Sequence, residues 1–180
     1  SDDLFHAIRL FFLYLAQRKG MFALHSASIL YHDKAWLFSG HSGMGKSTHT
    51  ALWHQLIQTP YLNGDLNLIG SQNGSLCVYG IPWCGTSGIY TTRQYPLGGI
   101  ILLGRHPDQD VIDELSTQEK ILRVMQRMIS PAWTAELLDQ NLSFASKTAD
   151  KVPVFHLSCT MRPSAAQTAR EAIDRLEDLQ

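Results

Sequence analysis

Residues 37–48 read Leu37-Phe38-Ser39-Gly40-His41-Ser42-Gly43-Met44-Gly45-Lys46-Ser47-Thr48. An apolar run at 35–39 predicts a strand, and residues 47 to about 58, which stop before Pro60, predict a helix. Between them, Gly40 to Ser47 match the P-loop pattern G-x-x-x-x-G-K-[ST] in its required context of strand, loop and helix. A glycine-rich turn that binds nothing is the alternative, which the complete motif in this context disfavours.

The chemistry of this loop predicts a site for ATP and Mg²⁺. Its glycines let backbone N–H groups turn inward around phosphate oxygens, and the following helix adds the positive end of its dipole. Lys46 is expected to contact the β- and γ-phosphates, and the Ser47 hydroxyl to ligate Mg²⁺. The residues predicted to bind the nucleotide are Gly40, His41, Ser42, Gly43, Met44, Gly45, Lys46, Ser47 and Thr48.

Two side chains outside the loop join Lys46 as candidates for catalysis. Asp65 is the first carboxylate after the loop and follows a short predicted strand at 61–63, where it can ligate Mg²⁺ or take a proton from an acceptor hydroxyl. A turn aspartate that caps its own backbone is the alternative. His25 lies in the strand stretch before the loop and can donate to an oxyanion or relay a proton, although a histidine in this position, taken alone, is more often a core residue.

Helical and strand patterns alternate along the rest of the chain, which predicts an α/β fold. Ser116 and Glu119 form a capping box that opens a helix reaching about 129, and Ser164 is expected to cap a closing helix. A stretch at 80–88 is too rich in Gly and Pro for regular structure, and such loops often border sites. The other predicted elements are an amphipathic helix at 3–18 lying on the core through Leu4, Ile8, Phe11, Phe12 and Leu15, strands at 22–30, 66–69, 75–79, 97–103 and 152–157, turns at 32–34 and 71–74, a helix at 132–146, and core positions for Trp36, Trp53 and Trp133.

The composition fits one domain over residues 1–180 and argues against nucleic-acid and membrane partners. The 44% apolar content suffices for a single core, and 15 Lys and Arg against 16 Asp and Glu give no broad polyanion-binding surface. The most apolar N-terminal stretch is shorter than the roughly 18 residues needed to span a bilayer. Cys77, Cys84 and Cys159 fit neither a disulfide framework nor a zinc site, so a cytoplasmic location is expected. The first residues, Ser1-Asp2-Asp3, leave open that this is the C-terminal part of a longer chain.

The arrangement resembles the superfamily of HPr serine kinases and phosphoenolpyruvate carboxykinases, especially its small HPr-kinase-like proteins. The resemblance spans most of the chain and includes the loop itself. Its other markers are Leu24-His25-Ser26-Ala27-Ser28, Leu62-Asn63-Gly64-Asp65, Tyr79-Gly80-Ile81-Pro82-Trp83-Cys84-Gly85-Thr86 and Pro96-Leu97-Gly98-Gly99-Ile100-Ile101-Leu102-Leu103.

This resemblance implies a carboxykinase-like fold, in which a mixed sheet curls toward a barrel, carries the P-loop and has helices packed outside. It implies that His25 lies in the phosphate site and that Asp65 is the second of two aspartates that serve Mg²⁺ and proton transfer. The loop around Pro82 and Trp83 would border the active site. HPr kinases form oligomers, and this analogy leaves a homo-oligomer open without predicting one.

The sequence departs from this family at two places. Gly64 stands where the first aspartate of the pair would be, so Asp65 would have to serve both purposes. The Glu-x-Arg-Gly type of segment found in true HPr kinases is missing, which puts HPr itself in doubt as a substrate. The additional metal-binding lysine and histidine groups of full-length carboxykinases have no match either, so decarboxylation is not expected.

Three functions follow from these observations. The first is an ATP-dependent kinase that transfers the γ-phosphoryl group to a hydroxyl, expected to be a serine, of a peptide, a protein or a small molecule lying against the loop at 82–87. The second is a non-catalytic ATP-binding regulatory module, which the missing aspartate favours. The third is a phosphatase, pyrophosphate-using or carboxykinase-like enzyme on the same scaffold. We expect the first.

Overall fold

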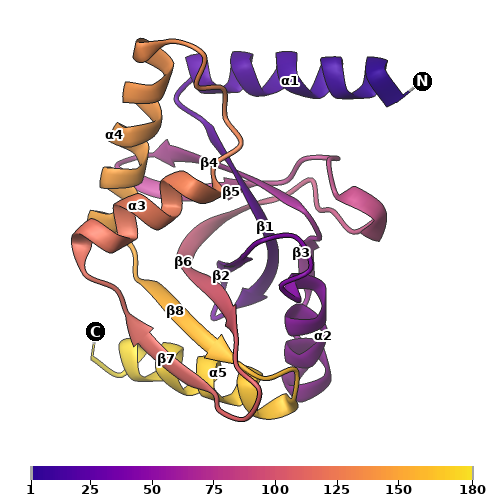
Figure 1. Ribbon diagram of the computed structural model, residues 1–180, viewed down its shortest axis with the longest axis vertical. Coiled ribbons are helices and arrows are strands. Elements are labelled where there is room, and N and C mark those ends of the chain that lie inside the picture. Colours follow the sequence, from indigo (N-terminus) through magenta and orange to yellow (C-terminus); the bar gives the residue numbers. More distant parts are fainter. Residues whose placement is uncertain (1, 180) are drawn as a thin grey trace.

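The computed structural model describes residues 2–179 as a closed β-barrel surrounded by helices (Figure 1). Its strands are β1 (Phe22–Tyr31), β2 (Lys34–Ser39), β3 (Tyr61–Asn63), β4 (Leu66–Gln72), β5 (Ser75–Tyr79), β6 (Gln94–Arg105), β7 (Val111–Glu114) and β8 (Val154–Cys159). The barrel runs in the order β2-β1-β4-β5-β6, and the parallel pairing of β6 with β2 closes it. β3 pairs with β1, while β8 and β7 extend the sheet outward from β6.

The sheet is mixed, as the resemblance implied. β6 runs parallel to β2 and to β8, whereas the remaining neighbours are antiparallel. Two tight hairpins support the antiparallel part, because His32-Asp33 and Asn73-Gly74 all have the positive φ angles that two-residue turns favour. The expected α/β fold with a curled, mixed sheet is therefore confirmed.

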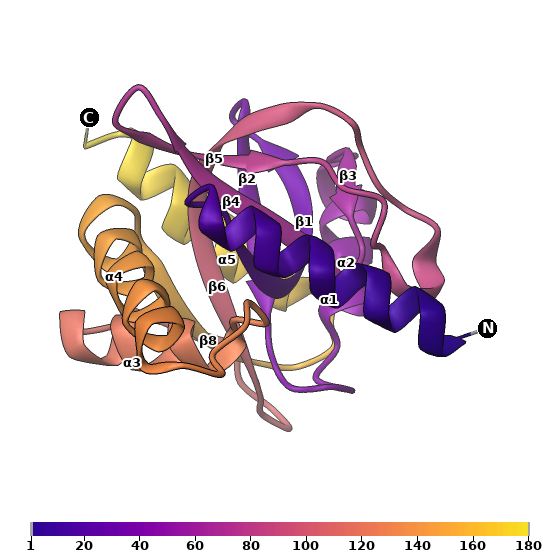
Figure 2. The same cartoon turned by 90° about the horizontal axis from the view of Figure 1, so that it is seen from above.

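Helices cover the outside of the barrel and one of its open ends. They are α1 (Asp2–Arg18), α2 (Lys46–Ile57), α3 (Thr117–Arg127), α4 (Ala135–Lys151) and α5 (Pro163–Glu177), with a short 3-10 turn, η1 (Gly85–Ser87). α3 packs on α4 and α2 packs on α5, so the helices form two pairs on different sides of the sheet (Figure 1). α1 lies across the end of the molecule near α4, and its N-terminal half extends beyond the barrel (Figures 1 and 2).

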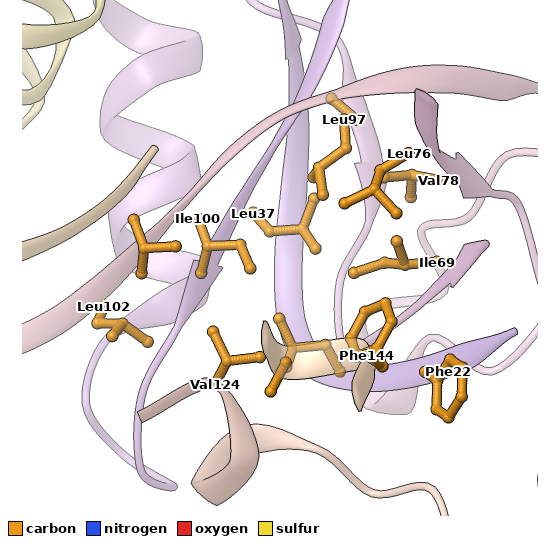
Figure 3. Close-up of a cluster of buried hydrophobic side chains, with 14 of the residues drawn as sticks. Phe22, Leu37, Ile69, Leu76, Val78, Leu97, Ile100, Leu102, Val124 and Phe144 are labelled. Carbon is orange, nitrogen blue, oxygen red and sulfur yellow. The ribbon is translucent and has the colours of Figure 1, made fainter. Parts of the chain in front are cut away.

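Side chains alternate between two cores along the strands, because successive residues of a strand point to opposite faces. Leu37 and Ile100 belong to the interior cluster, which Phe144 of α4 and Val124 of α3 complete (Figure 3). Their neighbours in sequence point the other way, into a second cluster covered by α2 and α5. The largest fully buried members of that second cluster are Ile29, Trp36, Phe38, Trp53, Ile101, Leu157 and Ile173.

The predicted packing of the N-terminal helix was wrong. Leu4, Ile8 and Phe11 are 61%, 53% and 63% exposed, whereas Leu13 and Ala16 are the apolar residues that the helix buries. The reason is that α1 is apolar around most of its circumference and reaches the barrel only through its C-terminal half. Phe12 is partly buried, and its ring lies 4.6 Å from that of Trp83.

Other predictions need smaller corrections. Trp133 is 63% exposed and stacks on Tyr14, because it precedes α4 rather than lying within it. α5 begins with Pro163, and the Ser164 hydroxyl donates to Asp110 instead of capping the helix. β6 is longer than expected, α4 starts and ends later, and the exposed edge strand β7 was not predicted.

In the part of the chain that the structure describes, no helix combines the length and the apolar character that crossing a bilayer would require.

A histidine buried beneath the glycine-rich loop makes stability depend on pH. His49 of α2 is 3% exposed, accepts a hydrogen bond from the Trp53 indole at 3.2 Å and contacts the ring of Phe38. Burial lowers the pKa of His49 to about 4 from its ordinary 6.5, so the imidazole stays neutral in the folded protein.

We predict that wild-type protein loses about 2 kcal/mol of unfolding free energy between pH 7.5 and pH 5 through His49 alone. In this window the unfolded chain takes up a proton that the folded protein does not, so stability falls as the pH falls. Urea unfolding at both pH values measures the loss. The variant His49→Gln keeps an acceptor for Trp53 but cannot titrate, and an equal loss in that variant would contradict the assignment.

Candidate active site

The glycine-rich loop at 40–45 joins β2 to α2. Gly43 (φ 75) and Gly45 (φ 95) adopt left-handed backbone conformations that residues with side chains rarely take. Gly45 is the N-cap of α2, and no side chain caps this end of the helix. The first residues of α2 line a cleft of about 470 Å³, so their free N–H groups can bind an anion there.

The Lys46 side chain lies over this loop. Its ammonium donates to the Gly40 carbonyl at 3.3 Å, and no carboxylate of residues 2–179 lies within 4.0 Å of it. Burial lowers the pKa of Lys46, and Arg127 lowers it further, while Asp65 acts in the opposite direction. A partly buried cation held only by a carbonyl is suited to receive an anion.

Asp65 and His25 face the loop as a hydrogen-bonded pair. His25 Nε2 lies 3.0 Å from Asp65 Oδ1, and each side chain is about one-third exposed, at 34% and 32%. This hydrogen bond lowers the pKa of the Asp65 carboxyl; burial opposes the effect, and the charges of His25, Lys46 and Arg9 add to it. Asp65 is therefore ionised at neutral pH, and its other oxygen has no hydrogen bond within the described chain.

A buried asparagine fixes the bend that carries Asp65. Asn63 is 3% exposed, and its side-chain oxygen accepts from the backbone N–H groups of Asp65 and Leu66 at 2.9 and 3.0 Å. Its amide nitrogen donates to the Ile81 carbonyl at 3.0 Å. Because both polar atoms of this side chain form hydrogen bonds, the bend has little freedom to move.

The surroundings of Gly64 leave no room for a second aspartate in the site. A Cβ at this position would lie 2.1 Å from Ser87 Oγ and 3.4 Å from the Cys84 carbonyl, so the loop around η1 occupies the space of a side chain. The Gly64 N–H also donates to the Ile89 carbonyl at 3.1 Å. An aspartate at position 64 would therefore collide with the loop around η1, which packs against the bend between β3 and β4.

Two arginines that sequence reasoning missed lie beside the glycine-rich loop. Arg127 lies at the end of α3, and its guanidinium nitrogens are 2.9 and 3.0 Å from the two ring nitrogens of His41. A neutral imidazole has only one acceptor nitrogen, so only one of these contacts can be a hydrogen bond. Arg105, from the end of β6, donates to the Gly43 carbonyl. Neither arginine has a carboxylate within 4.0 Å among residues 2–179, so both add uncompensated positive charge next to Lys46.

No local signal marked Arg127, because an arginine in the last turn of a helix ordinarily complements the helix dipole. Tertiary contacts bring it to the loop. The residues that follow it bridge to β1 through Leu24 and Met128, and the Ile129 N–H donates to the Ala23 carbonyl at 3.0 Å.

Most predicted site residues meet in one cleft. His25, Lys46 and Asp65 line it, together with Ser42, Gly43, Gly45, Ser47 and Thr48 of the loop and the segment from Cys84 to Ser87 opposite. Three predicted loop residues do not line it. Gly40 lies beneath Lys46, His41 contacts Arg127, and Met44 packs against the core under α2.

The cleft also has oxygen ligands that fit Mg²⁺. The Ser47 hydroxyl and the ionised Asp65 carboxylate both line it, and Mg²⁺ in nucleotide sites is commonly held by one or two protein oxygens together with phosphate oxygens and water. Residues 2–179 contain no group of three or more His, Cys, Asp or Glu side chains able to hold a metal by themselves. Phosphate oxygens and water would have to complete the coordination of a metal held by Ser47 and Asp65.

We predict that Gly64→Ala lowers the unfolding free energy by about 1–3 kcal/mol, because the added methyl group collides with Ser87. Urea unfolding of wild type, Gly64→Ala, Ser87→Gly and the double variant measures the coupling. The cost of Gly64→Ala should shrink in the Ser87→Gly background. An unchanged cost would mean that Ser87 does not restrict this position.

No family model and no curated protein matches the chain. Among solved structures, the HPr(Ser) kinase/phosphatase from Coxiella burnetii is similar, with 9% sequence identity, 87% of this chain and 94% of that chain covered, and a TM-score of 0.47.

Proposed function

We propose that this protein is an ATP-dependent phosphotransferase that passes the γ-phosphoryl group to a hydroxyl acceptor, with serine as the expected acceptor group. One observation carries the proposal: the hydrogen-bonded pair of Asp65 and His25 lines the same cleft as Lys46 and Ser47 at the start of α2. Anion-binding groups and a proton acceptor in one cleft are the parts that phosphoryl transfer requires.

Each group has a role in this proposal. The N–H groups at the start of α2 and the Lys46 ammonium bind the phosphates, and Arg127 adds charge at the loop. Asp65 orients the acceptor hydroxyl and takes its proton, while His25 holds the carboxylate in place and can pass the proton on. Ser47 and Asp65 would hold Mg²⁺, which offsets negative charge on the phosphates.

A non-catalytic ATP-binding module is the second candidate, and the single carboxylate favours it. With Gly64 in place of an aspartate, Asp65 must both hold Mg²⁺ and receive the proton. A module of this kind binds ATP and releases neither ADP nor a phosphorylated product.

The first test is transfer of phosphate from Mg-ATP to serine and serine-containing peptides, with ADP release measured in parallel. We expect wild type to transfer phosphate, and Lys46→Ala and Asp65→Asn each to lower the rate at least about 100-fold. Lys151→Ala and Asp150→Asn are matched controls on α4 that do not line the cleft.

Two results would count against this proposal. Tight ATP binding by wild type without turnover on any acceptor would support the regulatory module instead. Equal activity of Asp65→Asn and wild type would remove Asp65 from the chemistry.

Arg127 gives a second test, which needs no acceptor. We expect Arg127→Met to weaken ATP binding about 10- to 100-fold, because a hydrogen bond to a charged group contributes about 1.5–3 kcal/mol. The exposed Arg175 of α5 has no carboxylate within 4.0 Å in the described chain, and Arg175→Met is the control. Calorimetric titration with ATP measures both, and equal affinities would show that Arg127 does not contact the nucleotide.

A further inference from the structure

A second cavity, of about 500 Å³, lies between α4, the β4–β5 hairpin and the turn from α1 into β1. It shares no lining residue with the active-site cleft. Its volume falls within the range of sites that bind small molecules, roughly 300–1,000 Å³. The proposed phosphotransfer therefore makes no use of this cavity.

The floor of the cavity is apolar. Phe22 of β1 and Phe144 of α4 are buried and stack with their ring centres 4.6 Å apart (Figure 3), and the buried Leu76 of β5 lines the cavity with them. Met21 and Tyr79 also line the cavity. An apolar or aromatic group of a ligand would lose contact with water here, and this burial of apolar surface favours binding.

The rim carries charges of both signs. Lys19, Lys147 and Asp139 line the cavity with exposed side chains, and within residues 2–179 none of them has an opposite charge within 4.0 Å. The Lys147 ammonium donates to the Ser71 hydroxyl, which holds this lysine at the cavity. A ligand with one anionic and one cationic group can pair with both kinds of charge.

We propose that this cavity binds a free apolar α-amino acid. Its side chain lies against Phe22, Leu76 and Phe144. Its carboxylate pairs with Lys147 and Lys19, and its ammonium pairs with Asp139. An apolar floor and unpaired charges of both signs at the rim are together the complement of a zwitterion with an apolar side chain.

Calorimetric titration with three probes tests this assignment on wild-type protein. L-Phenylalanine carries both charges, 3-phenylpropionate lacks the ammonium and phenethylamine lacks the carboxylate. We expect phenylalanine to bind at least tenfold more tightly than either analogue. Failure of folded wild type to bind phenylalanine at up to about 10 mM would overturn the proposal. Tighter binding of the peptide Gly-Phe-Gly than of phenylalanine would overturn the assignment to a free amino acid.

Variants on one helix locate the site. Lys147→Met should weaken phenylalanine about tenfold and leave phenethylamine unchanged, whereas Asp139→Asn should weaken phenylalanine and leave 3-phenylpropionate unchanged. Lys151→Met and Asp150→Asn, on the same helix outside the cavity, are the matched controls. Ser143→Trp should fill the cavity and abolish binding, with circular dichroism showing that the variant is folded. Binding that survives Ser143→Trp and Lys147→Met places the amino acid elsewhere and overturns the proposal.

Discussion

Strand β1 pairs with three other strands, and the register of these pairs brings the two sides of the cleft together. On one edge of β1, residues 22–25 pair with β4, and residues 28 and 29 pair with β3. The short connection between β3 and β4 therefore lies opposite Ser26. The Ser26 N–H donates to the Asp65 carbonyl at 2.9 Å, which places Asp65 beside His25. On the other edge, Ser26 pairs with Ser39, and the Ser39 hydroxyl donates to the His25 carbonyl at 2.5 Å. The glycine-rich loop begins at the next residue, so the Asp65–His25 pair and the loop are both aligned on the same two residues of β1.

A polar network inside the barrel wall maintains this register. Ser26, Ser28, Asn63 and Asn67 are all nearly inaccessible, yet their side chains bond to one another or to the backbone. Such groups add little to stability compared with apolar residues of the same size, because their desolvation offsets most of the hydrogen-bond energy. Their value lies in specificity, since a shifted register would leave several buried groups unpaired. The network lies directly beneath the bend that holds Asp65.

Most features that depend on local rules could be predicted from the sequence, although the cap expected at Ser164 was not found. The loop, the start of α2, the capping box at Ser116 and the two-residue turns follow from glycine conformation, helix termini and turn chemistry, and their bounds agree to within about two residues. Errors occurred where distant contacts decide. The apolar pattern of α1 could not show that half of this helix extends beyond the barrel. Arg127 lies at the site because the residues after α3 contact β1. The lack of space at Gly64 is due to Ser87. Neither contact could be predicted from the residues next to Arg127 or Gly64 in the sequence.

The closure of the barrel also bears on how the protein folds. Ala35 pairs with Leu97 and Ser39 with Leu102, and β6 in turn pairs with β8 near the C-terminal end of the described chain. Pairs so distant in sequence require large loops to close before any hydrogen bond forms, and topologies rich in them fold slowly. During synthesis, the strand that leads into the glycine-rich loop therefore lacks its β6 neighbour until residues beyond 102 have emerged from the ribosome. The partly made chain cannot assemble the cleft between this loop and Asp65, and its unpaired β2 edge is exposed to other chains until β6 has been made.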